Sequence, residues 1–211
     1  MKPLQVIACG ALAHELTALQ RANGWSGVQV QCLPAELHNR PERIPEAVRQ
    51  AIRAARPQVR ALFVAYGDCG TGGALDRVLA EEGVERLPGA HCYAFYAGPE
   101  RFDALAAAEP GTFYLTDFLA RHFERLVMRE LGLRAHPELR DLYFGHYRRV
   151  LWLTQTGDSA LATRARAAAE ALGLEFAQLH TGLGALETRV LRFVSQPPPV
   201  STTQESLSWP S

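Results

Sequence analysis

The chain has 211 residues, of which 47% are hydrophobic, and its 22 Lys and Arg balance its 22 Asp and Glu. Such a length and apolar content support a core of one large domain or two smaller halves, while zero net charge leaves no basic field for nucleic acid or an anionic membrane. No apolar run approaches the roughly 20 residues of a transmembrane helix, and no signal peptide precedes the first strand. Four widely spaced cysteines suggest reduced thiols. We therefore expect a cytoplasmic protein without a membrane role.

Strands and helices alternate through the first part of the chain. Apolar runs that end in glycine or polar turns predict strands at residues 4–8, 28–33, 61–65 and 84–87. Three helices are expected between these strands. Leucines at helical spacing predict one after the first strand, a proline suited to a first turn begins the second at 45–55, and residues 74–82 have helical character. The second strand alternates apolar and polar residues, as an edge strand does, and Cys32 on its apolar side is expected in the core.

The pattern is less regular from residue 92 to 146 and then restarts. We expect a helix from Cys92, with a strand at 92–96 as the alternative, then an extended segment at 111–115. A helix at 118–131, capped by Asp117, and an aromatic connector follow. After the restart, we expect a strand at 149–154 and a helix at 159–172 that is capped by Asp158. Two more strands are expected at 174–178 and 188–194.

This alternation predicts an α/β fold with a mainly parallel sheet and helices on both faces. We interpret residues 1–195 as a single domain, within which the restart suggests two similar halves, 1–135 and 147–195. The tail 196–211 is rich in Pro, Ser and Thr and is expected to be disordered.

The most informative stretch is Tyr66-Gly67-Asp68-Cys69-Gly70-Thr71-Gly72-Gly73, which joins the third strand to a helix. In an open parallel sheet such a turn lies at the carboxyl edge, where ligands bind, and its glycines allow a ligand close to the backbone. The turn matches neither a dinucleotide-binding nor a P-loop pattern. Cys69 is a candidate nucleophile and Asp68 a candidate general base; the alternative is a tight turn with a packed thiol.

Cysteines follow three of the predicted strands, at Cys9, Cys69 and Cys92. Because parallel strands end at the same edge of a sheet, we expect these three thiols to converge. His38 and His91 lie in loops that can reach the same edge. Cysteine together with histidine suits zinc, or iron in a cluster. The alternative is a group of small buried thiols that pack near a rim.

Further candidates for substrate binding lie in the predicted loops at strand ends: Asn39, Gly70, Gly72, Thr156, Asp158 and Gly182. Gly182 belongs to a short glycine loop whose backbone N–H groups can cradle an anion. Helix capping is the simpler role for Asp158.

Five short motifs carry a resemblance to a known family: Ala8-Cys9-Gly10, Leu37-His38-Asn39-Arg40-Pro41, Tyr66-Gly67-Asp68-Cys69-Gly70, His91-Cys92-Tyr93 and Gly111-Thr112-Phe113-Tyr114-Leu115-Thr116. Over about residues 5–190 the chain resembles a bacterial and archaeal domain-of-unknown-function family whose genes accompany those of corrinoid-dependent methyltransferases. The resemblance implies one-carbon metabolism beside a corrinoid protein or methyltransferase subunit, in cobalamin-dependent methionine synthesis or corrinoid reactivation. It brings no established activity, and the chain lacks the Asp-x-His-x-x-Gly segment typical of cobalamin-binding domains.

Three functions remain open at this point. The first is a metal-thiolate protein that assists corrinoid-dependent methyl transfer, with zinc or an iron–sulfur cluster on Cys9, Cys69 and Cys92 and a further ligand from His38 or His91. The second is a metal-free enzyme with Cys69 as nucleophile and either histidine as base. The third is a non-catalytic partner subunit or chaperone of a methyltransferase, with the aromatic connector as its partner surface.

Overall fold

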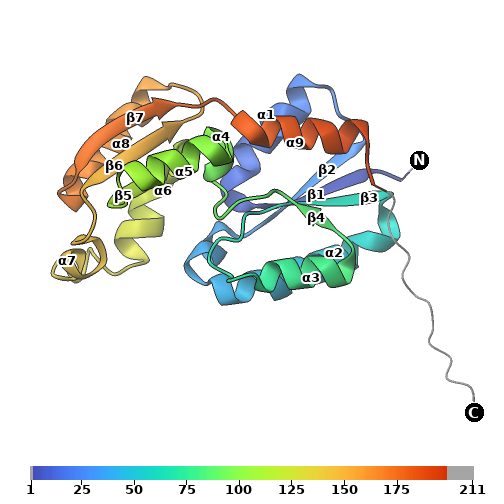
Figure 1. Cartoon of the computed structure of the whole chain (residues 1–211), viewed down its shortest axis with the longest axis horizontal. Coiled ribbons are helices and arrows are strands. Elements are labelled where there is room, and N and C mark those ends of the chain that lie inside the picture. Colours follow the sequence, from blue (N-terminus) through green and yellow to red (C-terminus); the bar gives the residue numbers. More distant parts are fainter. Residues whose placement is uncertain (1, 199–211) are drawn as a thin grey trace, which may run out of the picture.

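Two parallel sheets, each in its own lobe, form the framework of the computed structural model, which describes residues 2–198 (Figure 1). Their strand orders are β2-β1-β3-β4 and β5-β6-β7. The predicted α/β class is therefore confirmed, although the strands divide between two sheets. Of the predicted disordered tail, residues 199–211 lie outside the described part of the chain.

The first lobe is a four-stranded sheet covered on both faces. Its strands are β1 (Leu4–Cys9), β2 (Val28–Leu33), β3 (Ala61–Ala65) and β4 (Glu85–Arg86). Helices α1 (Ala13–Ala22) and α9 (Gly184–Ser195) cover one face, and α2 (Ile44–Ala55) and α3 (Ala74–Glu82) cover the other (Figure 1). The central strands β1 and β3 are buried along their whole length, as expected of parallel strands between two helical layers.

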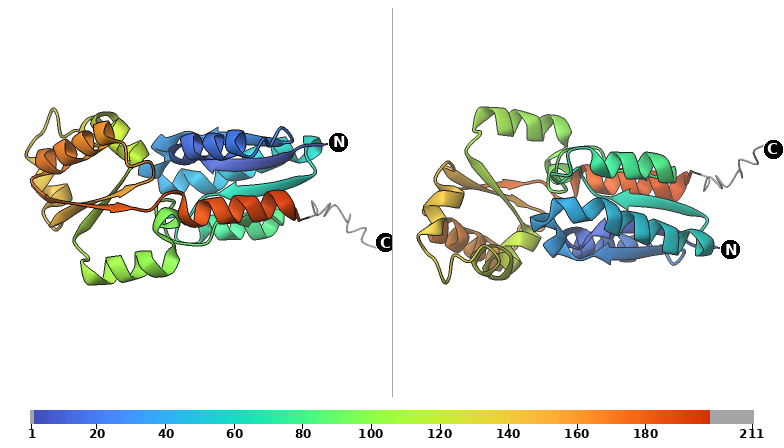
Figure 2. Two further views of the ribbon diagram at one scale, coloured as in Figure 1. Left: turned by 90° about the horizontal axis from the view of Figure 1, so that it is seen from above. Right: turned by 90° about the horizontal axis from the view of Figure 1, so that it is seen from below.

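The second lobe repeats this layering on a smaller scale. Its strands are β5 (Thr112–Thr116), β6 (Arg149–Thr154) and β7 (Glu175–His180). Helices α6 (Asp117–Phe123) and α8 (Ser159–Leu172) cover one face, and α5 (Pro99–Ala108) lies on the other (Figure 2). A π-helical segment, Glu124–Arg129, extends α6. The second sheet thus begins with β5, ahead of the restart that the sequence suggests at Arg149.

The chain crosses between the lobes twice. After α4 (Ala94–Ala97) it passes through Gly98 into the second lobe, and after β7 it returns so that α9 packs on the first sheet. The strand predicted at 188–194 is therefore wrong. Residues 186, 190 and 193 form a buried stripe at helical spacing, and this stripe packs in the first core, where the Phe193 ring stacks on that of Phe63 with centroids 5.3 Å apart.

Other local predictions need correction. The cap of α6 is Thr116, whose hydroxyl accepts from the Leu119 amide, whereas Asp117 is buried and accepts from the Trp152 indole at 3.0 Å and from Thr156. Cys32, expected in the core, is exposed, because β2 is an edge strand with a neighbour on one side only.

The aromatic connector contains a short helix, α7 (Leu139–Phe144), on which Leu142 is 72% and Tyr143 41% exposed. Among residues 2–198, no helix combines the length and apolar character needed to cross a membrane.

Candidate functional site

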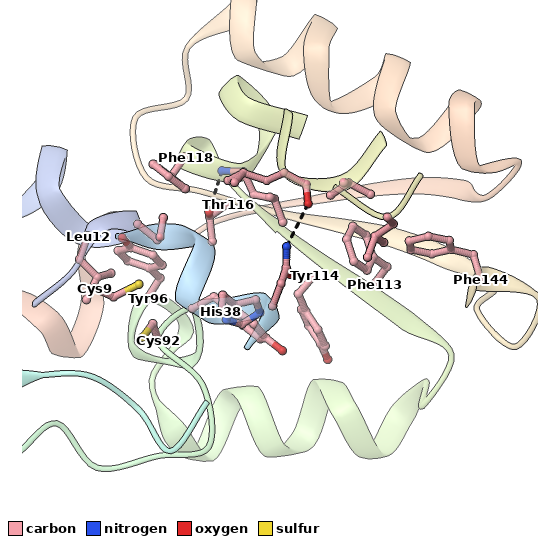
Figure 3. Close-up of a pocket in the computed structure, with 18 residues that line it drawn as sticks. Cys9, Leu12, His38, Cys92, Tyr96, Phe113, Tyr114, Thr116, Phe118 and Phe144 are labelled. Carbon is pink, nitrogen blue, oxygen red and sulfur yellow. Dashed lines mark hydrogen bonds between the residues drawn. The ribbon is translucent and has the colours of Figure 1, made fainter. Parts of the chain in front are cut away.

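A cavity of about 190 Å³ lies between the two lobes, near the ends of β1 and β5 (Figure 3). From the first lobe it is lined by Cys9, Cys92 and Tyr96, and from the second by mainly aromatic and aliphatic side chains that include Phe113 and Leu126. In parallel α/β folds the carboxyl edge of the sheet is where ligands bind. This cavity touches that edge in both lobes.

Three buried thiols meet beside the cavity. The sulfurs of Cys69 and Cys92 are 3.2 Å apart, and a hydrogen-bonding interaction with Cys92 also lowers the pKa of Cys9. All three are free cysteines, each less than 10% exposed. The backbone N–H of Gly67 points at the Cys92 sulfur at 3.5 Å. The structure therefore brings together the cysteines at the three strand ends, which we call the thiol cluster.

The glycine turn holds Cys69 against Cys92 through its backbone. The amides of Asp68 and Cys69 donate to the carbonyls of Gly89 and Ala90 at 3.0 and 2.7 Å. A Cβ at Gly67 would lie 2.8 Å from the His91 carbonyl carbon, so only glycine allows this close approach. Cys69 has a φ of +50°, and no other non-glycine residue in the described range has a positive φ. Such backbone strain is frequent where a side chain has to be presented for function.

Asp68, a candidate general base, has a structural task in this turn. Its carboxylate accepts from the Thr71 hydroxyl at 2.6 Å and from the amides of Gly72 and Gly73 at 3.2 and 2.9 Å. These hydrogen bonds, that of Thr71 first, hold the pKa of Asp68 below its usual value. Within the described residues no hydrogen bond joins this carboxylate to a cysteine, so Asp68 organises the turn and leaves the thiols to other partners.

His38 is the histidine that reaches the thiol cluster. It lies on an exposed 3-10 helix, Ala35–Asn39, at the edge of the cavity, and its pKa is raised by a hydrogen-bonding interaction with Cys69. The pKa of Cys69 falls to about 5, first because of the Cys92 thiol and then because of His38. The pKa of Cys92 is raised well above its usual value by its two cysteine neighbours and by burial. The lowered pKa favours the thiolate form of Cys69, which lies between the Cys92 thiol and the His38 ring.

His91 stays apart from the thiols. Its ring stacks on Tyr93 with centroids 4.8 Å apart, and burial lowers its pKa. Its Nδ1 has no hydrogen-bond partner among the residues of the described chain. Of the two histidines named from the sequence, only His38 makes a direct interaction with the cluster.

The other loop candidates divide between the two lobes. Asn39 lines the cavity, and its side-chain amide reaches the Leu126 carbonyl of the other lobe at 3.5 Å. Gly70 and Gly72 have positive φ in the glycine turn. The remaining candidates do not line the cavity: Thr156, Asp158 and Gly182, at strand ends of the second sheet. Asp158 caps α8, as predicted, by accepting from the Ala160 amide at 2.7 Å.

Sequence reasoning missed Tyr96, which lines the cavity beside Cys9 (Figure 3). It lies in the short helix α4, only 2% exposed, and its hydroxyl has no hydrogen-bond partner within residues 2–198. Its only signal in the sequence is a tyrosine four residues after Cys92, within an aromatic group otherwise typical of a core.

The described side chains are not arranged around a common metal position. Within residues 2–198 no group of three or more His, Cys, Asp or Glu could hold a metal ion as placed. Two sulfurs bound to one tetrahedral zinc lie roughly 3.8 Å apart, because each Zn–S bond is about 2.3 Å. The separation of 3.2 Å between Cys69 and Cys92 is instead that of hydrogen-bonded partners.

The chain matches a protein-family model over residues 32–190, and that model is described as a protein of unknown function (DUF1638). His38, Cys69 and Cys92 fall inside the matched segment, and Cys9 precedes it. Comparison with curated proteins and with solved structures gave no match. Because the matched segment covers well over half of the chain, the protein belongs to the DUF1638 family.

Proposed function

We propose that the protein is a metal-thiolate protein that assists corrinoid-dependent methyl transfer, with Cys9, Cys69 and Cys92 as sulfur donors and His38 as a further ligand. One observation carries the metal part of the proposal: three buried free thiols from separate strand ends meet beside a histidine. Buried thiolates repel one another, and a soft cation is the partner that offsets this cost. The corrinoid part rests on the resemblance of the sequence motifs alone.

The donor set fits a soft metal in kind. Sulfur and imidazole ligands select zinc or an iron–sulfur cluster over hard cations. For zinc, the sulfurs of Cys69 and Cys92 have to separate by about 0.6 Å from their present distance of 3.2 Å. Side-chain rotation supplies such a change, and His38 lies on an exposed helix that can follow. Zinc would activate a methyl-accepting thiol as a Lewis acid, and a cluster would supply electrons to an inactive corrinoid.

The chain's own residues give such a centre an apolar setting. Mainly apolar side chains line the second-lobe side of the cavity, which Cys9 and Cys92 line from the first lobe. A cavity of about 190 Å³ is far too small to enclose a corrinoid macrocycle. This size suits a protein that works beside a corrinoid protein, with the corrinoid held by the partner.

Metal analysis of protein purified without oxygen tests the proposal. We expect close to one equivalent of zinc, or iron with a visible absorption band, in the wild-type protein. Cys69→Ser should lose this metal, because a serine hydroxyl is a poor ligand for zinc or iron. The matched control is Cys32→Ser, which alters an exposed cysteine outside the cluster and should keep the metal. A wild-type protein without metal, or a Cys69→Ser variant that retains it, would refute the metal-thiolate function.

A second candidate function is a metal-free enzyme with Cys69 as nucleophile. The specific observation in its favour is the positive φ of Cys69, whose sulfur also interacts with His38. A thiolate paired with a histidine is a recurring arrangement in covalent catalysis. If the anaerobic protein contains no metal, a small alkylating reagent should modify Cys69 in the Cys32→Ser background, and His38→Gln should slow that modification. Equal rates with and without His38 would remove the histidine from this role.

A further inference from the structure

The Cys69 and Cys92 sulfurs have the separation of a hydrogen-bonded pair of thiols. They are 3.2 Å apart, and a disulfide bond is about 2.0 Å long, so the two atoms have to approach by about 1.2 Å to be joined. Rotation of the two side chains can supply such a movement. Both cysteines are free, and neither is engaged in another covalent bond. The structure therefore holds two thiols within reach of a covalent bond to each other.

The backbone fixes these two cysteines beside each other. The amides of Asp68 and Cys69 donate to carbonyls of the segment 89–90 at 3.0 and 2.7 Å, so the two chain segments are joined close to both thiols. Cys9 also interacts with Cys92, but within residues 2–198 no backbone hydrogen bond joins its segment to the residues around Cys92. A disulfide needs its two backbones at a restricted separation. These contacts favour Cys69 over Cys9 as the partner of Cys92.

A small solute can approach the pair from the space between the lobes. Cys92 and His38 both line the cavity of about 190 Å³ (Figure 3). His38 is an exposed residue, and it interacts with the Cys69 sulfur, so this thiol lies one side chain from the surface. A water molecule occupies about 30 Å³ in the liquid, and hydrogen peroxide adds a single oxygen atom to it. The cavity therefore has room for hydrogen peroxide.

We propose that Cys69 and Cys92 are a redox-active pair, which a peroxide oxidises to an intramolecular disulfide. One thiol takes an oxygen atom from hydrogen peroxide, becomes a sulfenic acid and releases a molecule of water. The sulfur of the other thiol then displaces this oxygen, which leaves as a second molecule of water with the remaining thiol hydrogen, and the S–S bond forms. Two thiols and one hydrogen peroxide thus give one disulfide and two molecules of water. A dithiol reductant reverses the reaction by exchange and is itself oxidised to a disulfide.

This chemistry goes beyond the proposed function and needs no bound metal. It needs only the two sulfurs, whose separation of 3.2 Å is shorter than the roughly 3.8 Å of two sulfurs on one zinc ion. If Cys69 and Cys92 do hold a metal, the disulfide removes two of its donors, and oxidation releases the ion. The pair would then make the thiol cluster sensitive to peroxide.

Peptide mapping tests the bond directly. Wild-type full-length protein, purified without oxygen, is treated with one equivalent of hydrogen peroxide, and the remaining thiols are alkylated in denaturant. Trypsin places Cys9, Cys69 and Cys92 on three separate peptides, 1–21, 61–77 and 87–101. We expect 61–77 linked to 87–101 in most molecules, and dithiothreitol should separate the two peptides. No link, or a link that joins 87–101 mainly to 1–21, would overturn the inference.

Two variants and a second oxidant define the site. Cys9→Ser should leave the link between Cys69 and Cys92 in place, and Cys32→Ser, which alters an exposed cysteine outside the cluster, should change neither its yield nor its rate. Loss of the link in Cys32→Ser would show that it arises through the exposed thiol. Glutathione disulfide, which is larger than the cavity, should form the link about tenfold more slowly than peroxide, because access limits thiol–disulfide exchange. Equal rates would exclude peroxide as the preferred oxidant. The wild-type map stands even if a variant does not fold.

The inference and the proposed function fail separately. A protein that holds metal but forms no link between Cys69 and Cys92 would overturn the inference and keep the proposed function. A link in a protein that is purified without metal would keep the inference and refute the metal-thiolate function. If metal is bound, peroxide should release it in step with the link.

Discussion

The ionisation of Cys69 is the most quantitative consequence of the thiol cluster. Its pKa of about 5, against a reference value of 9.0, favours the thiolate form at pH 7 in the metal-free protein. The first cause is the Cys92 thiol and the next favourable one is His38. Removing the sulfur by Cys69→Ser should therefore remove a thiolate signal that titrates near pH 5.

The same shift contributes to stability with a defined sign. An acid whose pKa is lower in the folded state favours folding fully above its unfolded pKa, here 9.0, and this contribution disappears as pH falls through about 5. Between those limits the contribution grows with pH, so that it is larger at pH 8 than at pH 6. The raised pKa of His38 acts in the opposite sense, since its contribution is present below pH 6.5 and is lost as pH rises through its folded pKa.

Two measurements on chelator-treated protein check this reasoning. Absorbance at 240 nm should report a thiolate midpoint near pH 5 in the wild type that is missing in Cys69→Ser, and the Cys32→Ser control should keep it. Urea unfolding at pH 6 and pH 8 should show a smaller gain in unfolding free energy with pH for Cys69→Ser than for the wild type. A midpoint that remains near pH 9, or identical pH dependence in both proteins, would show that the thiolate is not formed.

Three further predictions concern the scaffold of the site. Phe193→Ala removes a buried ring from α9 and should cost about 3–5 kcal/mol in urea unfolding, while the exposed Arg189→Ala should cost less than about 0.5 kcal/mol; similar values would contradict the packing of α9 on the first sheet. Asp117→Ala leaves the buried Trp152 indole and the part-buried donors of Thr156 without their acceptor and should cost about 3 kcal/mol by the same method, and a neutral result would mean that these donors find other partners. Gly67→Ala places a Cβ 2.8 Å from the His91 carbonyl carbon and should lower both the melting temperature and the 240 nm thiolate signal, whereas Gly27→Ala, at an open position that likewise lacks a positive φ, should change neither.

The sequence predicts those features that depend on local pattern and on strand direction. Asp158 caps α8 as expected, because capping needs only a side-chain oxygen on the residue that precedes the helix. The meeting of Cys9, Cys69 and Cys92 follows from parallel strands that end at one edge.

The remaining differences depend on non-local packing. Residues 188–194 include apolar residues compatible with a strand, and only the first lobe's open face decides that they form part of α9. Nor does any local pattern reveal that β5 belongs to a second sheet, in which it pairs with β6. Tyr96 illustrates the same limit in the site, because its place in the cavity wall depends on the meeting of the two lobes.

The return of α9 to the first lobe also determines which lobe can finish folding first during translation. A ribosome releases β1 to β4 well before residues 184–195, so the nascent first lobe lacks the helix that packs on Phe63 and contacts α4 next to Cys92. The strands of the second lobe, by contrast, are all released before α9. The first lobe therefore completes its core last, with an apolar face exposed until α9 emerges.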